Sequence, residues 1–170
     1  MKFICIMGRS NSGKTTVEKT LEQMGFKRSI SYTTREPRIN ESIQEQDGVD
    51  YKFVTEDKFM ALVDKGKIIE YERHNDNLYG TPRPFGAKRY VAVVCLGGYR
   101  ALRNIYGEQV FGVYLKCDED TAMSRGETHE DNENILKCME DEADIVINSN
   151  QDLNKMLADI LKAFRDKNIE

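Results

Sequence analysis

One segment near the start of the chain has the residue types and spacing of a phosphate-binding loop. Gly8-Arg9-Ser10-Asn11-Ser12-Gly13-Lys14-Thr15 fits the pattern G-x-x-x-x-G-K-[ST] at every position. Small residues allow successive backbone N–H groups to converge on a nucleotide phosphate, and Lys14 would reach the β- and γ-phosphates while the Thr15 hydroxyl holds Mg²⁺. An ordinary Gly/Ser-rich turn is the alternative, and the loop alone leaves ATPases, GTPases and kinases open. The predicted nucleotide-binding residues are Gly8, Ser10, Asn11, Ser12, Gly13, Lys14, Thr15 and Thr16.

A second candidate anion site follows in Ser31-Tyr32-Thr33-Thr34-Arg35-Glu36-Pro37-Arg38. Arg35 and Arg38 lie three residues apart beside four hydroxyls, and Pro37 prevents a helix from continuing through the segment. Guanidinium groups and hydroxyls suit a terminal phosphate, which offers several oxygens for paired contacts. A solvated basic loop is the alternative for this pair.

The elements that would position these residues alternate between strands and helices. Residues 2–7 form an apolar run that ends at a glycine, as a buried parallel strand does, and residues 14–24 then follow a helical pattern. This order predicts an α/β fold with a central parallel sheet flanked by helices. Further strands are expected at 89–96, 109–115 and 144–147, and further helices at 98–106, 118–124, 134–142 and 151–166.

The middle of the chain differs from this alternation. Between about 30 and 80, short strand-like pieces at 51–54, 67–72 and 76–79 surround one helical stretch at 55–65. We expect a small mixed α/β insertion here, which would hold a second substrate.

Composition limits the class of protein. The chain has 170 residues, of which 39% are apolar and 32% charged, so we expect a single folded domain. The net charge of -4 argues against general nucleic-acid binding, and the contrast between a basic segment at 1–40 and an acidic one at 117–144 suggests a local anionic ligand. No apolar run is long enough to cross a membrane, so we expect a cytoplasmic protein without a membrane partner. The cysteines at 5, 95, 117 and 138 lack metal-site spacing and are expected to be free thiols.

Several motifs together resemble the guanylate kinase family. They are the phosphate loop, the segment 31–38, Asp47-Gly48-Val49-Asp50-Tyr51-Lys52-Phe53-Val54, then Ile69-Glu70-Tyr71 and Asn77-Leu78-Tyr79-Gly80-Thr81. The resemblance is specific from residue 3 to about 81 and weaker afterwards. It implies a P-loop kinase fold that transfers the γ-phosphoryl group of ATP to GMP or dGMP with Mg²⁺, built as a core, a GMP-binding subregion and a lid.

The resemblance also implies residue roles. Lys14, Arg35 and Arg125 would neutralise charge during transfer, and Asn148 would lie near the adenine of ATP. Independently of the family, an ionised Glu70 is able to accept hydrogen bonds from N1–H and the 2-amino group of guanine together. A surface-strand glutamate is the alternative for Glu70, as core packing is for the tyrosines. The GMP phosphate would be held by Arg35, Arg38, Tyr51 and Tyr79, and the guanine edge by Ser31, Glu70 and Thr81.

The chain departs from the family pattern at the strand that follows the GMP-binding subregion. Aligned on Gly98, the Asp-x-Asp of the family is replaced by Val93 and Cys95, which leaves metal handling and nucleotide selectivity open. The lid is altered as well, since Lys137 stands where the family has arginine. Asp47, Asp50 and Asp76 are candidates to replace the missing carboxylates.

Two further expectations concern residues outside these motifs. The prolines of 82–89 predict a loop, in which Arg83, Lys88 and Arg89 are solvated. His74 and His129 are expected at the surface or in a polar network.

We therefore expect one P-loop kinase domain, with a shortened lid, acting as a monomer or homodimer. Two alternatives stay open: a kinase for another nucleoside monophosphate or a phosphorylated sugar, and a non-catalytic guanylate-kinase-like binding module. The expected parts are a core at about 1–30, 89–124 and 144–170, a GMP-binding subregion at about 31–81 and a lid at about 125–143.

Overall fold

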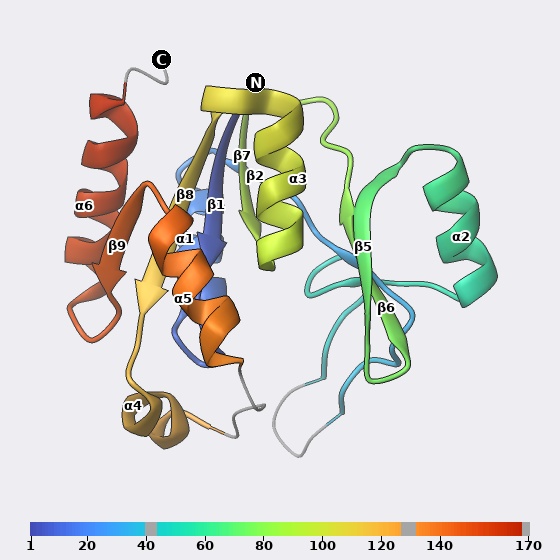
Figure 1. The fold of residues 1–170 in the computed structure, drawn as a ribbon, viewed down its shortest axis with the longest axis horizontal. Coiled ribbons are helices and arrows are strands. Elements are labelled where there is room, and N and C mark those ends of the chain that lie inside the picture. Colours follow the sequence, from blue (N-terminus) through green and yellow to red (C-terminus); the bar gives the residue numbers. More distant parts are fainter. Residues whose placement is uncertain (40–43, 127–131, 168–170) are drawn as a thin grey trace.

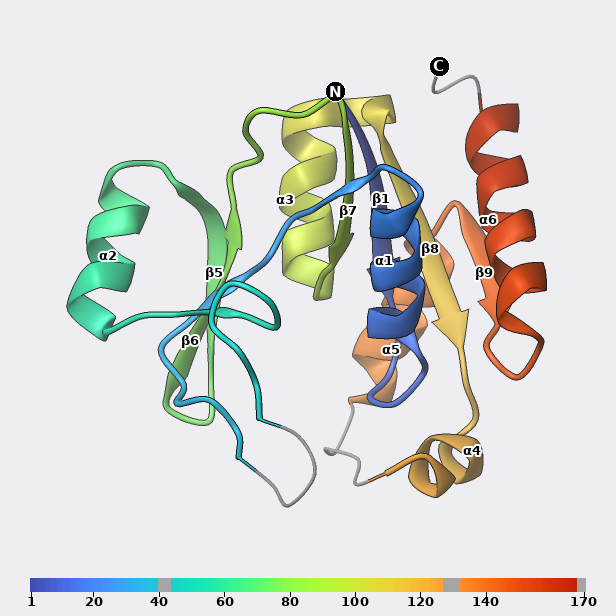
Figure 2. The ribbon, with the colours of Figure 1, turned by 180° about the vertical axis from the view of Figure 1, so that it is seen from behind.

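The computed structural model of the chain describes residues 1–39, 44–126 and 132–167. A five-stranded parallel sheet in the order β2-β7-β1-β8-β9 forms its centre, and helices cover both faces (Figures 1 and 2). This confirms the predicted α/β fold. The strands of this sheet are β1 (Lys2–Met7), β2 (Lys27–Arg28), β7 (Arg89–Val93), β8 (Val110–Lys116) and β9 (Ile145–Asn148).

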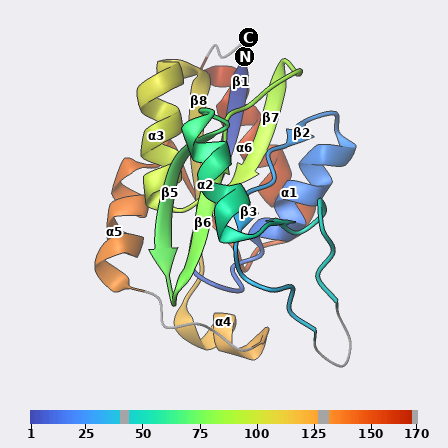
Figure 3. The same cartoon turned by 90° about the vertical axis from the view of Figure 1, so that its right-hand side faces the viewer.

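Successive side chains of β1 enter opposite layers of the core, because neighbouring residues of a strand point to opposite faces. Ile4 and Ile6 pack in the layer of α1 and α6, whereas Phe3, Cys5 and Met7 pack in the layer of α3 and α5. Figure 3 shows the sheet between these two layers. The helices are α1 (Lys14–Gln23), α2 (Glu56–Asp64), α3 (Leu96–Tyr106), α4 (Glu119–Ser124), α5 (Glu133–Glu142) and α6 (Leu153–Asp166), with a 3₁₀ turn at Gly107–Gln109.

A second, smaller sheet lies beside α3 (Figure 1). Its order is β4-β3-β6-β5, and only the β3–β4 pair is parallel. One face packs on α2 around Phe59, Ile68 and Leu78, which leaves the other face for polar side chains. Its strands are β3 (Tyr32–Thr33), β4 (Lys52–Phe53), β5 (Ile68–His74) and β6 (Asn77–Pro82).

The expected elements are confirmed with small shifts of their ends. The strand expected at 89–96 ends at Val93, because α3 already begins at Leu96 with Cys95 as its N-cap. The two-residue strands β2 and β3 were not expected, since two residues show no periodicity.

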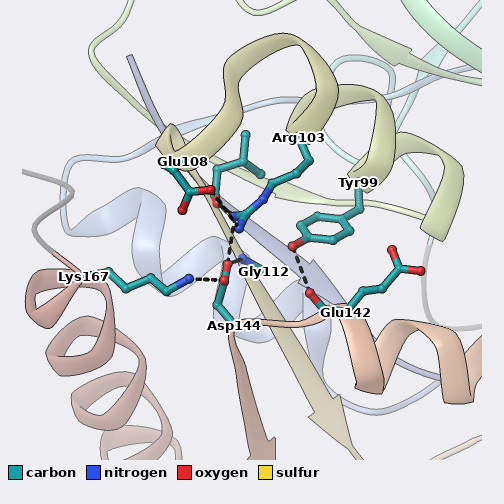
Figure 4. Close-up of polar contacts among 8 residues, drawn as sticks. Tyr99, Arg103, Glu108, Gly112, Glu142, Asp144 and Lys167 are labelled. Atoms are coloured by element: carbon teal, nitrogen blue, oxygen red, sulfur yellow. Dashed lines mark hydrogen bonds and ion pairs between the residues drawn. The ribbon is translucent and has the colours of Figure 1, made fainter.

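A polar cluster ties the two helical layers to the end of the sheet where β8 begins (Figure 4). The carboxylate of Asp144 accepts a hydrogen bond of 2.7 Å from the Gly112 N–H and forms ion pairs with Arg103 (3.2 Å) and Lys167. Its side chain is only 6% exposed. Asp144 therefore joins α3, β8 and the end of α6 at one point.

Among the described residues, no helix combines the length and apolarity needed to cross a lipid bilayer. All four cysteines carry free thiols, as expected from their spacing.

Candidate active site

The phosphate loop follows the carboxyl end of β1 and leads directly into α1. Gly8 has a φ of 147°, and a Cβ at this position would lie 2.7 Å from the carbonyl oxygen of Leu115. Gly13 has a φ of 90° and immediately precedes the helix, whose first residue is Lys14. Only glycine accommodates both the close approach and the backbone conformation. The first turn of α1 therefore lies at the cavity lined by Lys14 and Thr15, where a helix N-terminus favours an anion.

Hydrogen bonds and an ion pair within the chain hold the phosphate loop in place. The ammonium of Lys14 donates to the carbonyl of Arg9, and the guanidinium of Arg9 pairs with Glu133 on α5. The Arg9 side chain is 10% exposed. The hydroxyl of Ser12 is buried and has no hydrogen-bond partner among the described residues.

A cavity of about 500 Å³ extends from the phosphate loop to the small sheet. A second cavity of about 220 Å³ continues along that sheet, and the two share Ser31, Tyr51, His74, Tyr79 and Val93. The structure therefore brings the predicted donor and acceptor regions to two adjoining cavities, which together are called the hollow below. The larger part is lined by Ser10, Asn11, Lys14, Thr15, Arg35, Arg38, Tyr51 and Tyr79, and the smaller part by Ser31, Tyr51, Glu70, Tyr79 and Thr81.

Arg35 is held in the larger cavity by Glu45. Its two terminal nitrogens donate to the two Glu45 oxygens at 2.8 and 3.0 Å, and the guanidinium lies 5.5 Å from the ring centre of Tyr51. Burial raises the pKa of Glu45, but hydrogen bonds from Arg35 and the Arg38 N–H outweigh burial and lower it overall. The Nε atom of Arg35 is buried without a partner among the described residues. Glu45 carried no signal in the sequence, because its approach to Arg35 depends on the path of the intervening loop.

Glu70 lies at the far end of the hollow, on β5, opposite Thr81 on β6. The Thr81 hydroxyl donates to the Glu70 carboxylate at 3.3 Å. A Cβ at Gly97 would lie 2.8 Å from a Glu70 oxygen, and one at Gly98 would lie 2.5 Å from the Thr81 hydroxyl. The two glycines thus allow the start of α3 to close this pocket. Burial, followed by the neighbouring charge of Glu72, raises the pKa of Glu70, while the Thr81 hydrogen bond opposes the shift.

A buried ion pair lies under Val93, where the family pattern has a carboxylate. Glu18 on α1 pairs with Arg28 on β2 at 2.8 Å and accepts a 3.2 Å hydrogen bond from the Val93 N–H. Burial raises the pKa of Glu18, and the Arg28 charge opposes this. Both residues line the larger cavity. Sequence reasoning missed them, although Glu18 lies four residues after Lys14 and so shares its helix face.

Of the three proposed substitutes for the missing carboxylates, Asp50 alone lines one of these two cavities. Asp47 instead accepts from the Phe53 N–H at 2.9 Å, and Asp76 lies in the β5–β6 turn with a φ of 62°. His74 is exposed, as expected, but it also faces both cavities and contacts the ring of Tyr79.

The structure does not bring every predicted residue to the hollow. Arg125 lines neither of these two cavities and instead donates to the carbonyls of Asn11 (3.4 Å) and Ser149 (3.1 Å). Asn148 is exposed at the end of β9, and Thr16 is exposed on α1. Their roles stay predictions.

The predicted lid falls partly outside the described residues, as does His129. Leu136 and Met139 of α5 are buried in the layer of α3, so this helix belongs to the packed core in the structure. Lys137 is exposed and pairs with Asp141 on the same helix.

Comparison with known proteins gives consistent similarities. The guanylate kinase family model matches residues 1–85, the half of the chain that holds the phosphate loop, Arg35, Glu70 and Thr81. A guanylate kinase of Clostridioides difficile is 42% identical over 83 residues, which cover 48% of this chain and 38% of that protein. A guanylate kinase of Latilactobacillus sakei is 35% identical over 120 residues, covering 69% and 55%. The matched segments thus span about two fifths to just over half of these relatives.

The fold is similar along nearly the whole chain. The crystal structure of guanylate kinase from Anaplasma phagocytophilum superposes with a TM-score of 0.69 at 22% identity and covers 99% of this chain and 87% of that one. Since the family model matches half of the chain and the phosphate loop and small sheet have the expected geometry, the chain belongs to the guanylate kinase family.

Proposed function

We propose that this chain transfers the γ-phosphoryl group of ATP to GMP or dGMP. The observation that carries the proposal is the pair of adjoining cavities between the phosphate loop and the small sheet. The phosphate loop at one end, Arg35 beyond it and the Glu70 carboxylate at the far end would correspond to a donor nucleotide, an acceptor phosphate and an acceptor base. Direct transfer requires this arrangement, because catalysis of phosphoryl transfer depends mainly on positioning and on positive charge.

In this proposal Lys14 binds the β- and γ-phosphates, and Arg35 binds the acceptor phosphate. Arg38, Tyr51 and Tyr79 line the same cavity and would complete the acceptor-phosphate site. Since the Arg35 guanidinium is already held by Glu45, it keeps its orientation before the acceptor binds. The phosphate would then meet a preorganised cation, which lowers the cost of binding.

The residues of the larger cavity fit a Mg²⁺ ion bound together with the donor nucleotide. Mg²⁺ keeps several waters and usually takes few protein ligands beside the phosphates. Thr15 lines the cavity next to Lys14 and would supply its hydroxyl as the protein ligand. When bound, the ion would neutralise charge on the phosphate oxygens.

Arg125 and Asn148 would act on the donor side of the site. Arg125 contacts the phosphate loop through the Asn11 carbonyl, so its guanidinium lies next to the loop that would bind the donor phosphates. Asn148 would approach the adenine from the end of β9. In this proposal the single domain consists of the core, the GMP-binding subregion at about 31–81 and the lid.

The test is ADP production in a coupled assay with GMP, dGMP, AMP, UMP and CMP compared side by side. We expect turnover with GMP and dGMP and little with the others. Turnover with another acceptor but not with guanine nucleotides would overturn the assignment of the base. Calorimetric titration with ATP and GMP completes the test, because a non-catalytic binding module would bind neither nucleotide.

A further inference from the structure

The far wall of the smaller cavity contains a second carboxylate for which the sequence predicts no role. Glu70 and Glu72 are two residues apart on β5, and both line this cavity because alternate residues of a strand share a face. Cys95 approaches the same point from the residue before α3. One oxygen from each carboxylate and the sulfur of Cys95 all lie within 4.8 Å of one another.

The glutamates of the smaller cavity differ from those of the larger one in their partners. Glu18 and Glu45 pair with arginines, whereas neither Glu70 nor Glu72 forms an ion pair within the described part of the chain. Its neighbour Cys95 has a pKa raised to about 12 by burial, with further contributions from the charges of Glu70 and Glu72 and a hydrogen bond to Glu72. The Cys95 thiol is therefore neutral. Of the three groups, only the two carboxylates on β5 give this wall its negative charge.

The charge of Glu72 disfavours the ionised form of Glu70, and a ligand edge with several N–H donors relieves this. On guanine, N1–H and one amino hydrogen satisfy one carboxylate, and the second amino hydrogen points to a further acceptor. Adenine lacks the paired donors, and hypoxanthine has N1–H but no amine.

We propose that Glu72 is a specificity-determining residue that accepts the second hydrogen of the exocyclic amine of the acceptor base, while Glu70 accepts the ring N–H and the first. This inference rests on the proposed function. It also explains how the chain accommodates Cys95 where the family has an aspartate, because Glu72 on β5 supplies the carboxylate acceptor that the cysteine lacks. A base without the amine lacks the hydrogen bond to Glu72, so it binds less tightly than guanine.

The test compares kcat/KM for GMP and for inosine monophosphate, which is the same purine nucleotide without the amine. We expect Glu72→Gln to lower kcat/KM for GMP roughly 10-fold, chiefly through KM, and to leave inosine monophosphate within about twofold. Glu70→Gln should impair both acceptors, because N1–H is common to both bases. Glu56→Gln on α2 is the matched control, since its carboxylate pairs with Arg73 away from the cavity and its loss should change neither acceptor.

A second variant separates the position of the charge from the identity of the residue. Adding Cys95→Asp to Glu72→Gln returns a carboxylate to the same wall, and we expect it to restore part of the preference for GMP. An equal loss for both acceptors in Glu72→Gln, or no loss for either, would overturn the inference while the proposed function stands. If the unmodified chain turns over neither GMP nor dGMP, the proposed function itself fails.

Discussion

Arg35 shows how a single side chain is prepared for a ligand. Its planar fork donates to both oxygens of Glu45, and lysine offers no such fork. We expect Arg35→Lys to raise the KM for GMP roughly 10- to 100-fold, which corresponds to the loss of about 1.5–3 kcal/mol of charge-assisted hydrogen bonding. The KM for ATP should change little. The measurement is steady-state kinetics with each nucleotide varied in turn.

Arg73→Lys is the control for this change. Arg73 belongs to the same small sheet, but its half-exposed guanidinium pairs with Glu56 on α2 and not with a cavity residue. Its replacement should leave both KM values unchanged. If Arg35→Lys behaves like Arg73→Lys, the acceptor phosphate does not bind at Arg35.

Glu70 makes acceptor binding depend on pH. Burial and Glu72 raise its pKa, so the carboxylate takes up a proton at a higher pH than an ordinary glutamate does. A protonated Glu70 has lost one acceptor, so the Kd for GMP should rise as the pH falls from roughly 8 to 5. Calorimetry across this range measures the effect, and in Glu70→Gln the pH dependence due to this group should disappear. An unchanged pH profile in the variant would contradict this role of Glu70.

The same shift affects stability in the opposite sense. Because the pKa of Glu70 is raised in the folded state, the folded chain binds the proton more readily than the unfolded chain, and the group disfavours folding above the folded pKa. We expect Glu70→Gln to raise the free energy of unfolding at neutral pH while it weakens GMP binding. The gain should shrink as the pH falls through the folded pKa and vanish below the unfolded pKa. Urea unfolding at two pH values measures it.

At the scale of the elements, we expect the Asp144 cluster to contribute more to the stability of the core than any exposed ion pair near it. Asp144 connects α3 and β8 to the end of α6 through Arg103, Gly112 and Lys167 (Figure 4). Asp144→Asn keeps the shape but removes a largely buried charge from two cations. We expect a loss of about 2–3 kcal/mol in the free energy of unfolding, with KM values unchanged below the melting temperature.

Asp141→Asn on α5 provides the matched comparison. Asp141 pairs with Lys137 at 2.7 Å, but both side chains are more than half exposed. Its loss should cost at most about 0.5 kcal/mol. Equal thermal shifts for the two variants would show that burial of Asp144 does not strengthen its contacts.

At the scale of the whole molecule, the sequence predicted all but the shortest elements, but it did not predict which side chains would contact one another. The phosphate loop between β1 and α1 was predictable because glycines and a long apolar strand leave clear local patterns. β2 and β3 were not, since their two residues obtain their geometry from neighbouring strands. Arg28 lies on β2, so its buried pairing with Glu18 was equally hidden. Glu72 could have been found from strand alternation once Glu70 was assigned to the pocket wall.

The separation of the donor and acceptor sites between two sheets leads to a prediction about ATP consumption. The phosphate loop belongs to the main sheet, whereas Glu70 and the acceptor-phosphate residues belong to the small sheet or its flanking segments. Water has no groups by which the small sheet could hold it in line with the γ-phosphate, so ATP alone lacks a positioned acceptor. We expect ADP formation without acceptor to be below about one hundredth of the rate with GMP. Arg35→Lys should lower the rate with GMP and leave the acceptor-free rate unchanged, because that background does not use the small sheet. Equal rates with and without GMP would instead identify an ATPase and leave the small sheet without a role in transfer.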